Sequence, residues 1–182
     1  MKFNLQPILE NSLVKLSPLK ESDFAVLYEV ASDPLIWEQH PNKNRYQLKV
    51  FKTFFQGALE SKGAFCIFDQ ATSEVIGSTR FYYIEGQEDA ISVGYTFFRR
   101  SHWGRGFNQS AKSLMLAHAS GSFTRVLFQV GAENIRSQVA MERLGAVKIG
   151  EEVVAYYGEP EKLNYLYSIS LHCKNLPVMP VT

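Results

Sequence analysis

A glycine-containing segment between residues 99 and 108 has the residue types that bind a phosphate group. Gly104 and Gly106 stand one residue apart, after a run typical of a β-strand and before a run with helical spacing. Glycine lets a ligand approach the backbone closely, and the start of a helix presents unpaired N–H groups to an anion. Three arginines in the same segment add fork-shaped donors for phosphate oxygens. The segment therefore predicts a site for a phosphorylated ligand.

Two familiar phosphate loops do not fit this segment. Gly106 is followed by Phe107, Asn108 and Gln109, whereas a Walker loop places Lys and then Ser or Thr after its last glycine. Gln109 also occupies the position of the third glycine in the dinucleotide-binding fingerprint. An ordinary tight turn remains the alternative to a phosphate site of another kind.

A second candidate lies at residues 134–146, where helical spacing follows an asparagine. Asn134 is a preferred N-cap residue, and Gly145 is placed to end the helix. Ser137 lies three residues after Asn134, so the two side chains lie on the same side of the helix start. The alternative is that Asn134 is only a helix cap and Ser137 is only a serine on the helix surface.

The apolar spacing predicts the elements that position these residues. Strands are predicted at residues 13–16, 64–68, 75–83, 91–98, 125–130, 147–157 and 163–172. Helices are predicted at residues 21–31, 47–61, about 111–118 and 134–144. Tight polar turns between the second, third and fourth strands indicate an antiparallel meander. We therefore expect an α/β fold, in which four helices flank a mixed, mostly antiparallel sheet of about seven strands.

Length and composition predict one domain. The 182 residues can bury a substantial core, expected at about 13–172 with a loosely held tail at 174–182. A net charge of +1 argues against a nucleic-acid partner. No apolar run approaches ~18 residues and the amino terminus lacks a signal-peptide core, so no membrane association is expected. Cys66 and Cys173 fit a reducing compartment better than a disulfide framework, which favours a cytoplasmic monomer or homodimer.

The order of elements resembles that of the GCN5-related N-acetyltransferase (GNAT) family over residues 13–171. The turn Trp103-Gly104-Arg105-Gly106-Phe107-Asn108 is similar to the pyrophosphate-binding loop of the family. The stretch 134–146 is similar to the Asn-x-x-Ser-x-x-x-x-Glu-Lys-x-Gly-Phe stretch of the branch that acetylates ribosomal-protein amino termini. Three positions depart from the pattern, the first being Asn108, which replaces the small residue common after the loop aromatic. Ser101 stands where the loop often begins with Gln or Arg, and Ser92 stands where this branch often has a glutamate.

The resemblance implies an acetyl-CoA-dependent N-acetyltransferase that needs no metal. The loop amides would bind the pyrophosphate, and the fourth strand would splay from its neighbour and point an N–H at the thioester carbonyl. Asn134 would fix the pantetheine arm, and Ser137 would donate a proton or a hydrogen bond to the departing thiolate. The implied catalytic residues are thus Ser137 and Asn134. The implied acyl-CoA-binding residues are Tyr95, Thr96, Phe97, Arg100, His102, Trp103, Gly104, Arg105, Gly106, Phe107, Asn108, Asn134 and Ser137.

The acceptor site is implied by the same resemblance. In the family it is bordered by the segment after the first helix and by the last turn, which implies substrate contacts for Trp37, Glu38, His40 and Tyr156. Packing or surface positions are the alternative for each of them. Cys66 lies in an apolar strand and is predicted to serve only packing.

The expected reaction is direct attack of a primary amine on the thioester with both substrates bound together, without a covalent enzyme intermediate. Deprotonation at pH 7 costs about 4–5 kcal/mol for an amine with a pKa near ~10.4, but only ~1–1.5 kcal/mol for an α-amine with a pKa of about 8. With Ser92 in place of the glutamate, the base is left to Glu38, Glu85 or water, which favours a protein or peptide N-terminus as acceptor. A polyamine or aminoglycoside, a non-catalytic CoA-binding sensor or interaction module, and a nucleotide-binding module remain alternatives.

Overall fold

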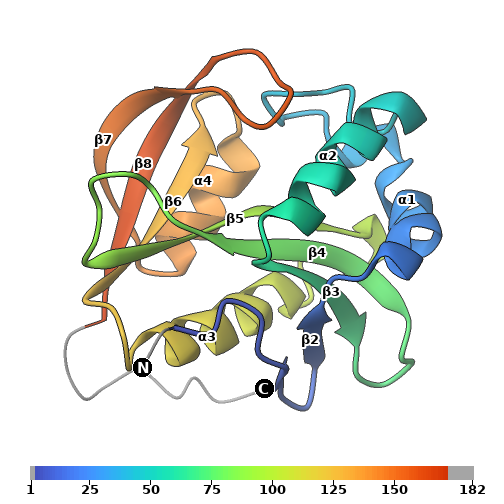
Figure 1. Cartoon of the computed structure of the whole chain (residues 1–182), viewed down its shortest axis with the longest axis horizontal. Coiled ribbons are helices and arrows are strands. Elements are labelled where there is room, and N and C mark those ends of the chain that lie inside the picture. Colours follow the sequence, from blue (N-terminus) through green and yellow to red (C-terminus); the bar gives the residue numbers. More distant parts are fainter. Residues whose placement is uncertain (1–2, 172–182) are drawn as a thin grey trace.

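An eight-stranded sheet forms the centre of the protein, and helices cover both of its faces (Figure 1). The computed structural model describes residues 3–171. The strands lie in the order β1-β2-β3-β4-β5-β6-β8-β7, and every neighbouring pair is antiparallel except β5 and β6. They are β1 (Leu9–Glu10), β2 (Val14–Pro18), β3 (Ala64–Asp69), β4 (Val75–Tyr82), β5 (Ala90–Phe98), β6 (Arg125–Gly131), β7 (Val147–Val154) and β8 (Lys162–Ser170).

The mixed, mostly antiparallel sheet with four α-helices confirms the predicted fold class. The predicted number of seven strands is one too low, because β1 has two residues and is too short to show an alternating pattern. The predicted strand at 147–157 also ends earlier, at Val154. The helices are α1 (Phe24–Ala31), α2 (Leu48–Glu60), α3 (Phe107–Ala119) and α4 (Ile135–Arg143). The end of the last predicted strand, at residue 172, and the predicted tail at 174–182 lie outside the described residues.

Two apolar cores lie on the two faces of the sheet. On one face, α1 and α2 pack against strand residues such as Cys66 and Phe97. The apolar residues of α2 recur at the spacing of one helix face, at Phe51, Phe54, Phe55 and Ala58. On the other face, α3 and α4 pack against the strands. The sheet is thereby held rigidly between two helical layers, which positions the groups along its strands.

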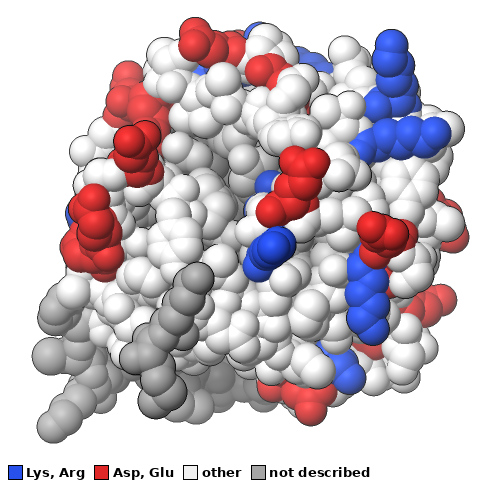
Figure 2. Space-filling model, viewed as in Figure 1, with Lys and Arg blue, Asp and Glu red and all other residues white. Residues whose placement is uncertain are grey.

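The surface carries charges of both signs. Basic and acidic side chains are mixed over the face shown in Figure 2, with acidic side chains along the side formed by β7 and β8. This mixture fits the nearly neutral net charge of +1. None of the helices formed by residues 3–171 is long and apolar enough to cross a membrane.

Strands β5 and β6 part after three residue pairs. The last pair is Ser92 with Leu127, and no pairing follows between residues 93–98 and 128–131. On its other edge, β5 stays paired with β4, with a register shift between Ser78 and Arg80. Tyr95 lies at this irregularity with a left-handed φ of 55°, which is unusual for a bulky residue and marks a bulge that redirects the strand. We call the space between 93–98 and 128–131 the fork, since backbone groups of β5 face it without a sheet partner.

Candidate active site

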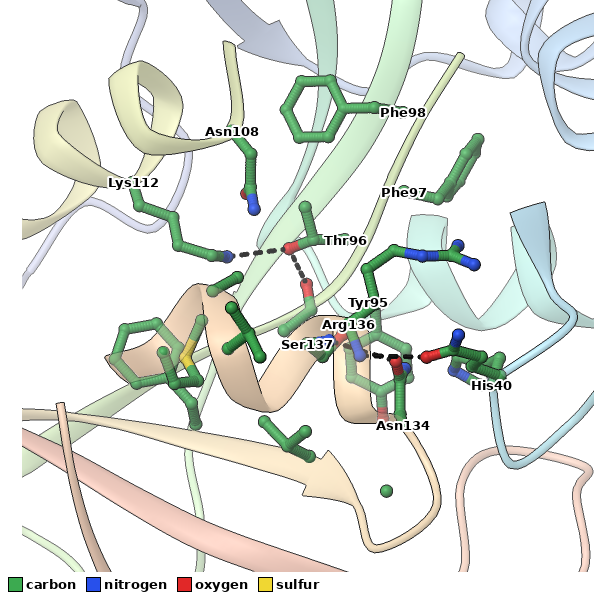
Figure 3. A pocket seen from close by; sticks show the side chains of 18 of the residues that line it. His40, Tyr95, Thr96, Phe97, Phe98, Asn108, Lys112, Asn134, Arg136 and Ser137 are labelled. Carbon is green, nitrogen blue, oxygen red and sulfur yellow. Dashed lines mark hydrogen bonds between the residues drawn. The ribbon is translucent and has the colours of Figure 1, made fainter. Parts of the chain in front are cut away.

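A cavity of about 720 Å³ extends from the glycine segment, through the fork, to the segment after α1 (Figure 3). Most of the residues predicted from the sequence line it. They are Trp37, His40, Tyr95, Thr96, Phe97, His102, Trp103, Gly104, Gly106, Phe107, Asn108, Asn134, Ser137 and Tyr156. The predicted residues Glu38, Arg100 and Arg105 do not line it. The fold therefore brings both sequence motifs to one cavity.

The glycine segment has a backbone that only glycine adopts easily. Gly104 and Gly106 have left-handed φ angles of 70° and 83°, and α3 begins directly after Gly106. The first backbone bond of the helix is donated by the N–H of Ser110 to the Gly106 carbonyl, at 2.9 Å. The amides of residues 107–109 therefore have no acceptor within the helix and are available to an anion. The local geometry fits the diphosphate of an acyl-CoA.

The side chains around this loop mostly hold the loop itself. His102 is buried, with its Nε2 3.3 Å from a carboxylate oxygen of Asp69 and its ring against the edge of Phe107. Arg100 pairs with Asp33, and Arg105 donates to the Ser101 carbonyl at 3.3 Å. Contact of either arginine with a phosphate stays a prediction. The groups of this loop that are left free for an anion are therefore mainly main-chain amides.

A glycine substitution tests this main-chain site. Gly106→Ala is expected to weaken CoA binding about tenfold, because a left-handed conformation costs an alanine about 1–2 kcal/mol and the loop relaxes away from it. Isothermal titration calorimetry measures the change. Gly121→Ala is the matched control, since Gly121 has no left-handed φ and no neighbour within 4 Å of an added Cβ. Equal CoA affinities for the two variants would contradict the main-chain site.

The start of α4 forms the second wall of the cavity. Asn134 caps the helix, because its Oδ1 accepts the N–H of Ser137 at 3.1 Å, and this confirms the predicted N-cap. The cap leaves the NH₂ group of Asn134 available as a donor. Sequence reasoning did not identify Arg136, whose guanidinium lies 4.0 Å over the Trp103 ring and 3.6 Å from the exposed Glu38 carboxylate. The pair of Arg136 and Trp103 thus connects α4 to the glycine segment.

A buried lysine lies at the fork. The Nζ of Lys112 donates to the Thr96 hydroxyl at 3.3 Å and lies 5.5 Å from the centre of the Phe128 ring. Burial lowers the pKa of Lys112 to about 8. Sequence reasoning did not identify this residue either. The available signal was its place on α3 between Ala111 and Met115, where a single lysine interrupts the core face.

The far end of the cavity is organised by a buried ion pair. Arg45 donates from Nε and Nη2 to the two carboxylate oxygens of Glu159, at 2.6 and 2.9 Å. Nη1 of Arg45 also lies 3.0 Å from Nε2 of His40. Because a guanidinium can only donate, Nε2 accepts from Arg45 and the ring proton lies on Nδ1, which is 3.2 Å from the carbonyl oxygen and 2.9 Å from the backbone nitrogen of Asn42. This end therefore joins the segment after α1 to the turn before β8.

Aromatic side chains complete the far end. Trp37 is buried and donates from its indole N–H to the Ala31 carbonyl at 2.7 Å, so it also anchors the end of α1. Tyr95 packs edge-on against Tyr82 and Tyr156, with ring centres at 5.3 and 5.4 Å. Tyr82 and Tyr156 donate to amide oxygens of Gln129 and Asn164. Burial raises the pKa of each of these three tyrosines, so all stay neutral hydrogen-bonding groups.

The position of His40 predicts a pH effect on stability. Burial and the neighbouring charge of Arg45 hold the pKa of His40 well below its usual range. As pH falls below about 6.5, the unfolded chain takes up a proton that the folded chain refuses, so the free energy of unfolding falls by up to about 1.4 kcal/mol per pH unit. Urea denaturation at pH 7 and 5.5 should show a loss about 1 kcal/mol larger in the wild type than in His40→Gln. Equal losses in both proteins would refute the effect.

No acidic side chain lines the cavity within the described part of the chain. Glu38 and Glu85, two of the bases considered from the sequence, are exposed and lie outside the lining. Ser92 is buried at the closed end of the fork, and its Oγ has no hydrogen-bond partner. Of the basic lining residues, Arg45 is paired with Glu159 and Arg136 lies 3.6 Å from Glu38, whereas Lys112 has no ionic partner among residues 3–171.

A family model described as "Acetyltransferase (GNAT) domain" matches residues 14–147. The structure resembles a GNAT-family acetyltransferase from Bacillus anthracis, with 17% sequence identity, coverage of 91% of this chain and 99% of that chain, and a TM-score of 0.73. An acetyltransferase from T. thermophilus has 25% identity, coverage of 90% and 89%, and a TM-score of 0.71. A proposed ribosomal-protein-serine acetyltransferase from Vibrio cholerae has 17% identity, coverage of 90% and 97%, and a TM-score of 0.68. No curated protein matches the chain.

Proposed function

The chain belongs to the GNAT acetyltransferase family and is an acetyl-CoA-dependent acyltransferase, and we propose that its acceptor is the α-amino group of a protein or peptide. The family defines the donor and the reaction class. The acceptor is a separate question, because it depends on the far end of the cavity. The observation that carries the proposal is the charge of the cavity lining.

Acceptors with several positive charges fit this cavity poorly. A polyamine or an aminoglycoside brings two or more ammonium groups into the site, and buried cations require acidic partners. The lining holds no acidic side chain among the described residues, and the nearby carboxylate of Glu159 is already paired with Arg45. A peptide N-terminus brings one amine, which loses its charge before it attacks.

The cost of that deprotonation also favours an α-amine. At pH 7 an α-amine with a pKa of about 8 needs ~1–1.5 kcal/mol to become neutral, whereas a lysine side chain needs about 4–5 kcal/mol. The cavity offers no carboxylate base to offset the larger cost. The name of the V. cholerae relative, a ribosomal-protein-serine acetyltransferase, agrees with such an acceptor.

The residues of the cavity suit direct transfer between two bound substrates. The amides at the start of α3 bind the diphosphate, and the free edge of β5 lies along the pantetheine arm. A backbone N–H of β5 stabilises the oxyanion that forms on the thioester carbonyl. Asn134 donates to the arm, and Ser137 donates to the sulfur. Trp37, His40 and Tyr156 shape the acceptor end, where the neutral Nε2 of His40 is held by Arg45.

An acceptor screen tests the proposed function. Thiol release from acetyl-CoA and mass spectrometry would compare three probes: peptides with a free α-amine, the same peptides with a blocked α-amine and a free lysine, and spermidine or kanamycin. We expect acetylation of the free α-amine and little activity with the other amines. Preference for spermidine or kanamycin would overturn the proposed acceptor. Tight CoA binding without turnover of any amine would favour a non-catalytic CoA-binding protein.

A further inference from the structure

The ammonium group of Lys112 lies across the fork. Its hydrogen-bond acceptor, Thr96, belongs to β5 (Figure 3). Phe128, whose ring centre is 5.5 Å from the ammonium group, belongs to β6. Phe128 directly follows Leu127, the last residue of β6 that pairs with β5. The ammonium group therefore lies between the two strands of the fork, while the glycine segment follows the end of β5 at the mouth of the fork. The side chain is only 6% exposed and lines the cavity.

This cation has no compensating charge in the described chain. Burial is the one cause that lowers its pKa, and no carboxylate of residues 3–171 forms an ion pair with it. A buried ammonium group without an ionic partner is costly, and methionine would fill the same space without that cost. The presence of a buried, unpaired ammonium group is explained if a negative charge forms beside it during the reaction.

The layout of the cavity indicates where that charge appears. Negative charge of an acyl-CoA forms at three positions near the cavity: the diphosphate, the carbonyl oxygen of the attacked thioester, and the sulfur once the thioester has broken. The diphosphate suits the amides at the start of α3. The arm then runs along the free edge of β5 into the fork, where Thr96 and Lys112 lie. A backbone N–H of β5 serves the carbonyl oxygen, which leaves the sulfur as the anionic atom for Lys112.

We propose that Lys112 is a catalytic residue whose ammonium group stabilises the negative charge on the CoA sulfur as the thioester breaks. The lone pair of the acceptor amine forms the new N–C bond, and the electron pair of the C–S bond leaves on sulfur. The proton lost by the amine nitrogen balances the proton gained by the sulfur, and Lys112 stays charged throughout. Lys112 reaches the cavity from α3, whereas Ser137 reaches it from α4 (Figure 3). The proposal rests on the acetyl-CoA-dependent reaction but not on the identity of the acceptor.

The pKa of the thiol in bound CoA tests this proposal without any amine. A free thiol of this kind has a pKa of about 8.5, and a neighbouring ammonium group should lower it by about one unit. Ultraviolet absorbance of the thiolate, followed by pH titration of the CoA complex, measures the shift. An unchanged or raised thiol pKa in the wild-type complex would overturn the proposal.

Variants assign the shift to Lys112. At pH 8 wild-type protein should bind CoA about threefold more tightly than desulfo-CoA, which lacks the thiol, because a thiol pKa lowered by about one unit from about 8.5 leaves most of the bound thiol ionised. Lys112→Met should reduce this ratio to about one and leave desulfo-CoA affinity unchanged. Lys112→Arg should keep most of the ratio, and Lys52→Met, an exposed change on α2, should keep all of it. If folded Lys112→Met kept the wild-type ratio of CoA affinity to desulfo-CoA affinity, the proposed stabilisation of the sulfur by Lys112 would be refuted.

The experiments on Lys112 and the acceptor screen can fail independently of each other. A lowered thiol pKa that depends on Lys112, together with preference for spermidine, would support the role of Lys112 and overturn the acceptor. Acetylation of α-amines with equal kcat in wild type and Lys112→Met would support the acceptor and overturn the role of Lys112. Should Lys112→Met fail to fold, the wild-type thiol pKa still decides.

Discussion

Ser137→Ala is expected to lower kcat for acetyl transfer by about 100-fold, because donation of a proton or hydrogen bond to a leaving group contributes about 10²–10⁴-fold. Ser137 lines the cavity from the first turn of α4, where the Asn134 cap fixes its backbone. The cap accepts a backbone N–H, so loss of the hydroxyl leaves the helix start intact. CoA affinity should therefore stay within about twofold of wild type, while the thiol is expelled more slowly.

Steady-state kinetics with the amine found in the screen, together with titration of CoA, separates these two effects. Ser113→Ala on the exposed side of α3 serves as the matched control and should behave as wild type. Ser137→Thr retains a hydroxyl and should recover part of the rate. A kcat near the wild-type value in Ser137→Ala would exclude the donor role, and a loss confined to KM would reassign Ser137 to binding.

Glu159→Gln is expected to lower the free energy of unfolding by about 3–5 kcal/mol, because removal of one partner leaves a buried charge unpaired. The side chains of Arg45 and Glu159 are only 2% and 6% exposed, and their contact is bidentate. Arg45 also stacks on Phe54, with its guanidinium 4.5 Å from the ring centre. Water therefore cannot replace the lost carboxylate. Urea denaturation of the purified protein measures the change.

The exposed pair of Arg99 and Glu29 provides the control for the buried pair. Its side chains are 35% and 69% exposed, so Glu29→Gln should cost no more than about 1 kcal/mol. The double variant Arg45→Met with Glu159→Leu should recover most of the stability, since both buried charges are gone. A similar small loss for Glu159→Gln and Glu29→Gln would show that the buried pair is not what holds this end of the cavity.

Features that depend on local backbone geometry were predictable from the sequence. Gly104 and Gly106 were recognised because a left-handed turn before a helix selects glycine. Asn134 was recognised because an N-cap selects a short polar side chain. The helices were predicted from the spacing of apolar residues, which reports one buried face of each element.

Features that depend on contacts between distant segments were not predictable. Arg45 and Glu159 are separated by 114 residues, and each lies in an irregular segment without periodicity. Lys112 was not predicted to be a site residue because a lysine in a helix ordinarily reaches solvent. Its burial depends on the parting of β5 and β6. The strand β1 was not predicted because its two residues are too few to show an alternation of apolar and polar side chains.

The two ends of the cavity are built from different parts of the polypeptide. The proposed donor end consists of main-chain amides and the free edge of a strand, so many side chains there could change without loss of the proposed cosubstrate contacts. The proposed acceptor end consists of side chains from two loops that the ion pair of Arg45 and Glu159 holds together. Evolutionary drift in these two loops can thus alter acceptor preference while the chemistry of acyl transfer is inherited unchanged. Redesign of the enzyme for a new amine should accordingly begin with residues 37–41 and 156–158, with the ion pair kept in place.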